Sequence, residues 1–186
     1  MQHITRRRFT ADQYRQMHRS GILDEDDRVE LIDGEIVQLS PIGSIHAAQV
    51  NRLTQALTHH IAQRAIVSVQ NPVHIDVYSE PQTDVAVLKP RPDFFAAAHP
   101  TAAEVLLVVE VSDSSITYDR RVKLPLYALA GIPSAWLIDL QRPGTVEVHW
   151  QPAGGRFTHV EMIGLEGTLT IPGLPDVAVP AQHVLA

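Results

Sequence analysis

Residues 105–111 read Val-Leu-Leu-Val-Val-Glu-Val, an almost unbroken apolar run. Such a run is typical of a central strand that is covered on both faces, so it requires a sheet with other elements packed above and below it. Its one polar member is Glu110. An unpaired carboxylate there would be strongly unfavourable or would stay protonated, because burial penalises the charged form. The run therefore predicts a central strand and a cation close to Glu110.

The patterns on both sides of this run indicate an α/β (α+β) chain. Asp33-Gly34 between β-prone runs at 28–32 and 35–39 is a strong hairpin signal. Thr10-x-x-Gln13 is a capping box that begins a helix ending at Gly21. The other expected elements are strands at 65–70, 73–78, 84–88, 135–139, 146–150 and 157–161, a helix over 44–64 capped by Ser44, and a helix over 115–130 kinked at Pro125. Together these elements predict a mixed β-sheet flanked by helices, with an N-terminal helix and β-hairpin.

Length and composition narrow the class of protein further. The 186 residues fit a single domain, 1–186, with a core of about 9–150 and a C-terminal β or loop extension, 151–186. The absence of cysteine excludes disulfides and thiolate ligands. No apolar run approaches the ~18 residues of a membrane span and none follows the basic N-terminal residues, so we expect a cytoplasmic protein. The net charge of −6 argues against broad polyanion binding but permits a local basic groove.

Asp84 is the second acid of interest, because it opens the strand pattern that precedes the central run. On neighbouring strands, Asp84 and Glu110 can lie side by side. Two carboxylates at one place repel each other unless a positive group or a shared proton lies between them. Mg²⁺ suits such a pair because it prefers oxygen ligands and retains waters. A shared proton or an arginine partner is the competing explanation, and spacing alone leaves both open.

Lysine is rare in this chain: of the 15 basic residues only Lys89 and Lys123 are lysines. Lys123 lies four residues after Asp119 and four before Tyr127, so the three share one side of the predicted helix. If that side faces the two carboxylates, the ammonium can orient a metal-bound water or stabilise developing negative charge. The alternative is a solvated lysine that pairs locally with Asp119.

Several motifs in a fixed order resemble those of a known family. In chain order they are Asp27-Arg-Val-Glu30-Leu-Ile-Asp-Gly-Glu35, Pro41-Ile-Gly-Ser-Ile-His46, Pro-x-x-Asp84, Val-Val-Glu110-Val-Ser, Asp119-Arg-Arg-Val-Lys123-Leu-Pro-Leu-Tyr127 and Gly-Ile-Pro-Ser-Ala-Trp136-Leu-Ile-Asp139. This order resembles the Uma family of putative restriction endonucleases, in the PD-(D/E)XK nuclease superfamily. The resemblance extends from about Phe9 to Trp150.

The resemblance implies a restriction-endonuclease-like core and an endonuclease that hydrolyses phosphodiester bonds in nucleic acid, with DNA as the expected substrate. It implies Mg²⁺ as the cofactor, with Mn²⁺ as a possible substitute, and a homodimer, since two sites cut the two strands of a duplex most simply. The implied site consists of Asp84, Glu110 and the backbone carbonyl of Val111 as metal ligands, Lys123 as the motif lysine, Glu30 as an accessory acid, and weaker contacts from Gln70, Tyr127 and His46.

Two positions depart from the superfamily pattern. The lysine of that pattern lies two residues after the second acid, where this chain has Ser112, and the residue before the first acid is Thr83 in place of proline. A lysine supplied by the following helix can fill the same space. If Lys123 points elsewhere, the alternative is a catalytically inactive nucleic-acid- or protein-binding module on the same fold.

Overall fold

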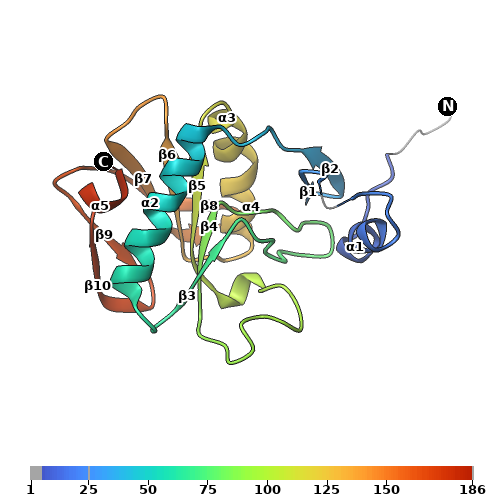
Figure 1. The fold of residues 1–186 in the computed structure, drawn as a ribbon, viewed down its shortest axis with the longest axis horizontal. Coiled ribbons are helices and arrows are strands. Elements are labelled where there is room, and N and C mark those ends of the chain that lie inside the picture. Colours follow the sequence, from blue (N-terminus) through green and yellow to red (C-terminus); the bar gives the residue numbers. More distant parts are fainter. Residues whose placement is uncertain (1–5, 25, 186) are drawn as a thin grey trace.

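A computed structural model describes residues 6–24 and 26–185. Its centre is a six-stranded sheet in the order β3-β4-β5-β6-β7-β8 (Figure 1). These strands are β3 (Ile66–Val69), β4 (Val85–Leu88), β5 (Val105–Ser112), β6 (Ser134–Asp139), β7 (Thr145–Ala153) and β8 (Arg156–Gly164). Two short antiparallel pairs accompany the sheet: β1 (Val29–Ile32) with β2 (Glu35–Gln38), and β9 (Thr168–Ile171) with β10 (Leu174–Pro180).

Helices lie on both sides of this sheet, and the N-terminal helix packs against the β1–β2 hairpin (Figure 1). They are α1 (Ala11–Arg19), α2 (Ser44–Ile61), a 3₁₀ turn (Ala102–Glu104), α3 (Ile116–Tyr118), a π-helical segment (Asp119–Lys123), α4 (Leu124–Leu129) and α5 (Gln182–Leu185). Among the described helices, none combines the length and the apolar character needed to cross a membrane.

The predicted central strand is confirmed. Every residue of β5 is buried, and the strand lies antiparallel to β4 and parallel to β6. Val85 pairs with Val109, so the same register continued by one residue places Asp84 opposite Glu110. The sheet thus brings the two acids to the same edge, where β4 begins and β5 ends.

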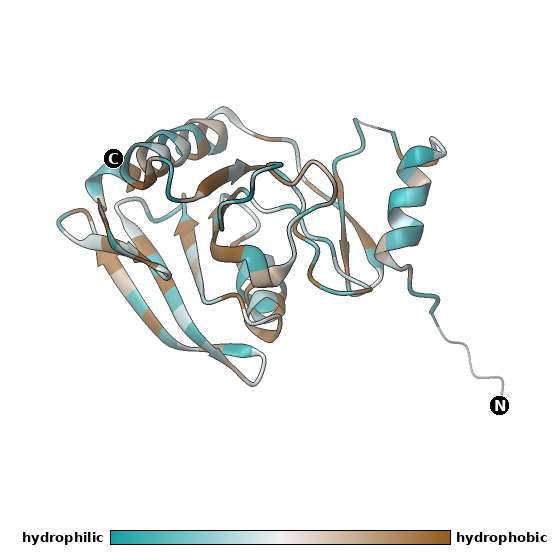
Figure 2. Ribbon diagram, turned by 90° about the horizontal axis from the view of Figure 1, so that it is seen from below, coloured by the Kyte–Doolittle hydropathy of each residue, from teal (hydrophilic) through white to brown (hydrophobic). Residues whose placement is uncertain are grey.

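Different helices cover the two faces of the sheet (Figure 2). On one face, α2 packs Leu53, Leu57 and Ile61 into a core that also includes residues of β9, β10 and α5. On the other face, α4 buries Leu124 and Tyr127 against β4, β5 and β6. The two-sided cover explains why β5 is apolar at almost every position.

The predicted hairpin and capping box are also confirmed. Asp33 and Gly34 join β1 to β2 with positive φ angles of 50° and 80°, as the tight hairpin turn requires. The Thr10 side chain accepts the Gln13 N–H at the start of α1, and the Gln13 side chain accepts the Thr10 N–H. The Tyr14 hydroxyl then donates to the carbonyl of Val29 at 2.9 Å, which fixes α1 to the hairpin.

We expect Gly34→Ala to lower the free energy of unfolding by more than about 1–2 kcal/mol, the usual cost of a left-handed conformation for a residue with a Cβ. The added Cβ would also lie 2.5 Å from Cβ of Arg8, so that residue must move. Gly21→Ala is the matched control, because Gly21 has a φ of 72° and no atom within 4 Å of the added Cβ. Urea denaturation should show the larger loss at Gly34, and equal losses would contradict the close contact.

The strand predicted at 73–78 is wrong. This segment makes only isolated bridges, and its amides bond to separate loops: the Val73 N–H donates to the carbonyl of Pro81, and the His74 N–H to that of Pro100. The Ile75 N–H donates to Ser79, which closes a tight turn. The alternating apolar residues therefore lie in a loop, of which only Val73 is fully buried, and periodicity alone does not distinguish such a loop from a strand.

The helix predicted over 115–130 forms, but the expected kink at Pro125 is wrong. Pro125 lies in the first turn of α4, and the irregularity precedes it as the π-helical segment, in which the Leu124 N–H donates to Asp119 five residues back. The wider turn is continuous with the helices on both sides. The predicted cap of α2 is also wrong, because Gly43, and not Ser44, occupies the cap position. The helix ends at Ile61, before the predicted end at 64.

Residues beyond 150 contribute to the core as well as to its periphery. Strand β7 continues to Ala153 and β8 is the sixth strand of the central sheet. Leu169, Val179 and Val184 are completely buried against α2 and the sheet. Residue 150, the expected end of the core, falls within β7.

Candidate active site

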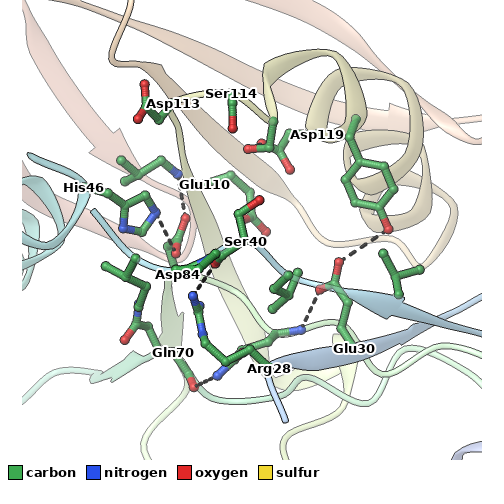
Figure 3. A pocket seen from close by; sticks show the side chains of 18 of the residues that line it. Arg28, Glu30, Ser40, His46, Gln70, Asp84, Glu110, Asp113, Ser114 and Asp119 are labelled. Carbon is green, nitrogen blue, oxygen red and sulfur yellow. Dashed lines mark hydrogen bonds and ion pairs between the residues drawn. The ribbon is translucent and has the colours of Figure 1, made fainter. Parts of the chain in front are cut away.

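A cavity of about 290 Å³ lies where β4 begins and β5 ends (Figure 3). Its walls come from the hairpin, the loop before α2, the start of α2, the two central strands and the π-helical segment. Of the residues implied by the family resemblance, seven line the cavity: Glu30, His46, Gln70, Asp84, Glu110, Val111 and Lys123. Tyr127 lies behind the cavity, buried against Glu110.

Lys123 is the cation predicted for Glu110. Its ammonium lies 3.0 Å from Oε1 of Glu110 and 3.4 Å from Oε2 of Glu30, and its side chain is only 5% exposed. The explanation of a solvated lysine paired with Asp119 is therefore wrong. The carboxylates of Glu110 and Glu30 raise the pKa of Lys123 well above its ordinary value, although burial acts in the opposite direction. The ammonium is thus a permanent positive charge in the site.

Tyr127 completes the surroundings of Glu110. Its hydroxyl donates to the same oxygen, Oε1, at 2.5 Å. Oε2 of Glu110 receives no hydrogen bond from residues 6–24 or 26–185. Burial raises the pKa of Glu110 to about 8, with Lys123 opposing the rise and Asp84 adding to it. In the absence of a further cation, Glu110 therefore holds its proton through neutral pH.

This raised pKa predicts a pH-dependent stability for the metal-free protein. Between about pH 4.5 and 8 the folded state holds a proton on Glu110 that the unfolded chain releases. The free energy of unfolding should therefore be greatest at the acid end of this window and should fall as the pH rises, by up to about 1.4 kcal/mol per unit. Glu110→Gln retains a neutral acceptor for Tyr127 and cannot titrate.

Urea denaturation in EDTA, across this window, compares the wild type with Glu110→Gln. The expected result is that the stability difference between the two proteins shifts in favour of Gln as the pH rises. Parallel pH profiles for the two proteins would show that Glu110 titrates normally.

Asp84 has a separate set of partners. Its Oδ2 accepts the N–H of Val111 at 2.8 Å, and its Oδ1 lies 3.2 Å from Nε2 of His46 (Figure 3). The hydrogen bond to Asp84 raises the pKa of His46, and burial opposes the rise. Nδ1 of His46 is buried without a hydrogen-bond partner in the described part of the chain. His46, predicted as a weak substrate contact, thus lies directly against the first acid.

The backbone of Gln82 connects the two halves of the site, a role that the sequence did not reveal. Its N–H donates to Glu30 at 3.1 Å and its carbonyl accepts from Lys123 at 2.9 Å. The Gln82 side chain donates to the carbonyl of Gln70 at 2.5 Å, so Gln70 meets the site through its backbone. The only signal was the place of Gln82 inside Pro-x-x-Asp84, because backbone groups carry no residue-type signature.

Ser112 occupies the position where the superfamily pattern has its lysine. It is completely buried, and its hydroxyl donates to Asp119 at 2.5 Å, while Ser115 donates to the same oxygen at 2.8 Å. These bonds join the end of β5 to the helical segment that carries Lys123. The serine thus holds in place the element from which the displaced lysine enters.

Charges in the cavity are unbalanced toward the acids. Five carboxylates line it, Glu30, Asp84, Glu110, Asp113 and Asp119, against two permanent cations, Arg28 and Lys123. Oxygen donors therefore dominate, as a hard divalent cation requires. No cluster of three or more metal-binding side chains is present in residues 6–24 and 26–185. The fit is to an ion such as Mg²⁺, which takes one or two carboxylates and fills its other positions with water.

The mixed sheet, its flanking helices and the acid pair at the strand ends define an α/β protein with a nuclease-like fold. A family model described as "Putative restriction endonuclease", Uma2, matches residues 11–182. The chain belongs to this Uma2 family.

A solved structure shares the fold. It is the crystal structure of a "putative nuclease belonging to DUF820" from Anabaena variabilis, with 14% sequence identity and a TM-score of 0.70 over 95% of this chain and 97% of that chain. At this identity the likeness establishes the fold alone. No curated protein matches the chain.

Proposed function

We propose that this protein is a divalent-cation-dependent endonuclease that hydrolyses phosphodiester bonds in DNA, with Mg²⁺ or Mn²⁺ as cofactor. The carrying observation is the position of Lys123, whose ammonium enters from the helix and reaches Glu110 at 3.0 Å in the cavity that Asp84 lines. This position supports the proposal that the displaced lysine serves in place of the lysine of the superfamily pattern. Membership of the Uma2 family supports the same reaction class.

Three oxygen donors would hold the ion: the carboxylate of Asp84, Oε2 of Glu110 and the backbone carbonyl of Val111. A bound divalent ion supplies a water of lowered pKa and neutralises charge on the phosphate. Lys123 places a fixed ammonium beside Glu110, where it orients the attacking water and stabilises negative charge that develops on the phosphate oxygens. Tyr127 and Glu30 keep Glu110 and Lys123 in position, since both are completely buried and contact them directly.

The acidic cavity also explains why the cation is essential to this proposal. Even with Glu110 protonated, the four other acids outnumber the two permanent cations, so an approaching phosphate is repelled unless a divalent ion reduces the negative charge. Arg28 also lines the cavity, and its guanidinium, which donates to the carbonyl of Ser40, is the side chain that we expect to contact a phosphate. A homodimer belongs to the proposal, because paired sites cut both strands of a duplex.

The second candidate is a catalytically inactive module that binds nucleic acid or protein. One observation favours it: Lys123 and Tyr127 already satisfy Oε1 of Glu110 without any metal. In this alternative, the acids and the lysine are a structural ion network.

A substrate panel separates the two candidates. Purified protein is incubated with single-stranded, double-stranded and branched DNA and with RNA, in Mg²⁺, in Mn²⁺ and in EDTA. The nuclease proposal predicts cleavage of at least one DNA form in metal and none in EDTA. Binding of DNA without cleavage in either metal would leave the inactive module.

A further inference from the structure

Strand β8 is an open edge of the central sheet. It lies outside β7 at the end of the strand order, and its nine residues make it more than twice as long as β3, the four-residue strand at the other edge. In Figure 2 the long β7–β8 hairpin lies at the lower left, with its outer strand directed away from the rest of the sheet. Alternate residues of such a strand direct their N–H and C=O groups outward, where they can pair with another strand.

This edge lacks two of the usual protections against pairing, lysine and proline. Gln151, the site of an irregular positive φ, lies on β7. Val160 and Met162 are 56% and 57% exposed. Across the sheet, Val160 lies in the same row as Ala135, and Met162 lies in the same row as Leu137. The two exposed side chains therefore extend the apolar face that α4 covers.

The order of side chains on β8 is self-complementary about Val160. If a second β8 pairs antiparallel with Val160 opposite its own copy, His159 faces Glu161 of the other chain, and Glu161 faces His159. Thr158 then faces Met162 on the other side of the ladder. Moving the centre to Glu161 would set two acids opposite each other, and moving it to His159 would set two histidines opposite each other. An imidazole opposite a carboxylate can donate a hydrogen bond to it, whereas two carboxylates directly opposite each other destabilise a sheet.

Leu129 extends the same apolar face. It is 72% exposed on α4, and the position of a Cβ on Gly155, in the turn before β8, lies 3.7 Å from it. In the register centred on Val160, this end of β8 meets the end of the partner strand that carries Met162. Leu129 of one copy and Met162 of the other copy then lie on the same side of the paired strands.

We infer that two copies of this chain associate through antiparallel pairing of their β8 strands, on a two-fold axis at Val160, to form one continuous sheet. Each copy presents the same surface, as a closed two-fold dimer requires. This assignment gives the proposed homodimer a surface, and it does not depend on the chemistry of the cavity.

Cysteine cross-linking tests the register, since the natural chain has no cysteine. Directly opposite residues of an antiparallel pair have Cα atoms about 4.5–5.5 Å apart, within disulfide range. Residues that are offset by two positions across the pair are about 7–8 Å apart. Val160→Cys should therefore give a disulfide-linked dimer under mild oxidation. His159→Cys and Val77→Cys, the latter at a site that is also 56% exposed, should remain largely monomeric on a denaturing gel. Equal cross-linking at all three sites would overturn the register.

Charge exchange tests the contact itself by sedimentation. Wild type should sediment as a dimer, and Val160→Lys should raise the dimer dissociation constant by more than about tenfold, whereas Val77→Lys should not change it. Glu161→Lys should weaken the dimer, and adding His159→Glu to that variant should restore it. A wild type that is monomeric at all concentrations, or a dimer indifferent to Val160→Lys, overturns the inference. Either outcome leaves metal-dependent cleavage unaffected, so failure of the interface and failure of the nuclease proposal are distinguishable.

Discussion

Replacing Lys123 with methionine should lower the free energy of unfolding by about 3–5 kcal/mol at neutral pH, the usual loss when one member of a buried ion pair is removed. Methionine fills much of the same volume but leaves the buried Glu30 without its cation. The carbonyl of Gln82 also loses its donor. Urea denaturation of the metal-free protein measures the change, and the same variant should lose nuclease activity because the fixed ammonium is gone.

The other lysine of the chain provides a matched control. Lys89 is exposed and donates to the carbonyl of Ala103 at 2.7 Å, so Lys89→Met should cost about 1 kcal/mol or less. Adding Glu30→Gln to Lys123→Met should recover part of the loss, since the neutral amide needs no cation. If Lys123→Met were as stable as Lys89→Met, the buried network of Lys123, Glu30 and Glu110 would not exist in solution.

Replacing Asp84 with asparagine should weaken Mn²⁺ binding by more than about 100-fold. Mutation of a residue that only holds a metal ligand in place already lowers metal affinity by about 10–100-fold, and loss of a ligand itself should cost more. The fold should change little. Asparagine keeps an oxygen that accepts the Val111 N–H, and the Asp84 side chain is partly exposed at 18%. Isothermal titration calorimetry with Mn²⁺ measures the affinity, and urea denaturation checks the fold.

Asp113→Asn is the matched control for Asp84. Asp113 lines the same cavity, but its carboxylate accepts from Gln141 and lies beyond the proposed ligands. This variant should bind Mn²⁺ within a few-fold of the wild type. Equal affinity losses in both variants would indicate a diffuse electrostatic effect of the acidic cavity in place of a defined ligand at Asp84.

The central strand and its acid could be predicted because they depend on local physics. A run in which six of seven residues are apolar requires a two-sided cover, and the one carboxylate in it requires a cation. The same reasoning identified Lys123 as a candidate, through its spacing from Asp119 and Tyr127. It did not establish the direction of the side chain, because the π-helical turn that carries Lys123 has no signal in the sequence.

Other parts of the site depend on backbone groups and on distant contacts. Gln82 connects Glu30 and Lys123 through its own N–H and carbonyl, which every residue type except proline possesses. The contact between His46 and Asp84 joins the start of α2 to β4, and only the packed fold brings these segments together. The segment 73–78 was misassigned because its amides bond partly to the distant Pro100 and partly within a local turn, and not to a neighbouring strand.

The most direct test of the central claim is cleavage of one DNA substrate by wild type, Asp84→Asn and Lys123→Met at matched folded concentrations, in Mg²⁺ and in EDTA. We expect cleavage by the wild type in Mg²⁺ alone, and a loss of at least about 10²–10³-fold in each variant. Cleavage that persists in EDTA, or that both variants retain at the wild-type rate, would contradict a metal-dependent nuclease site built on Asp84, Glu110 and Lys123.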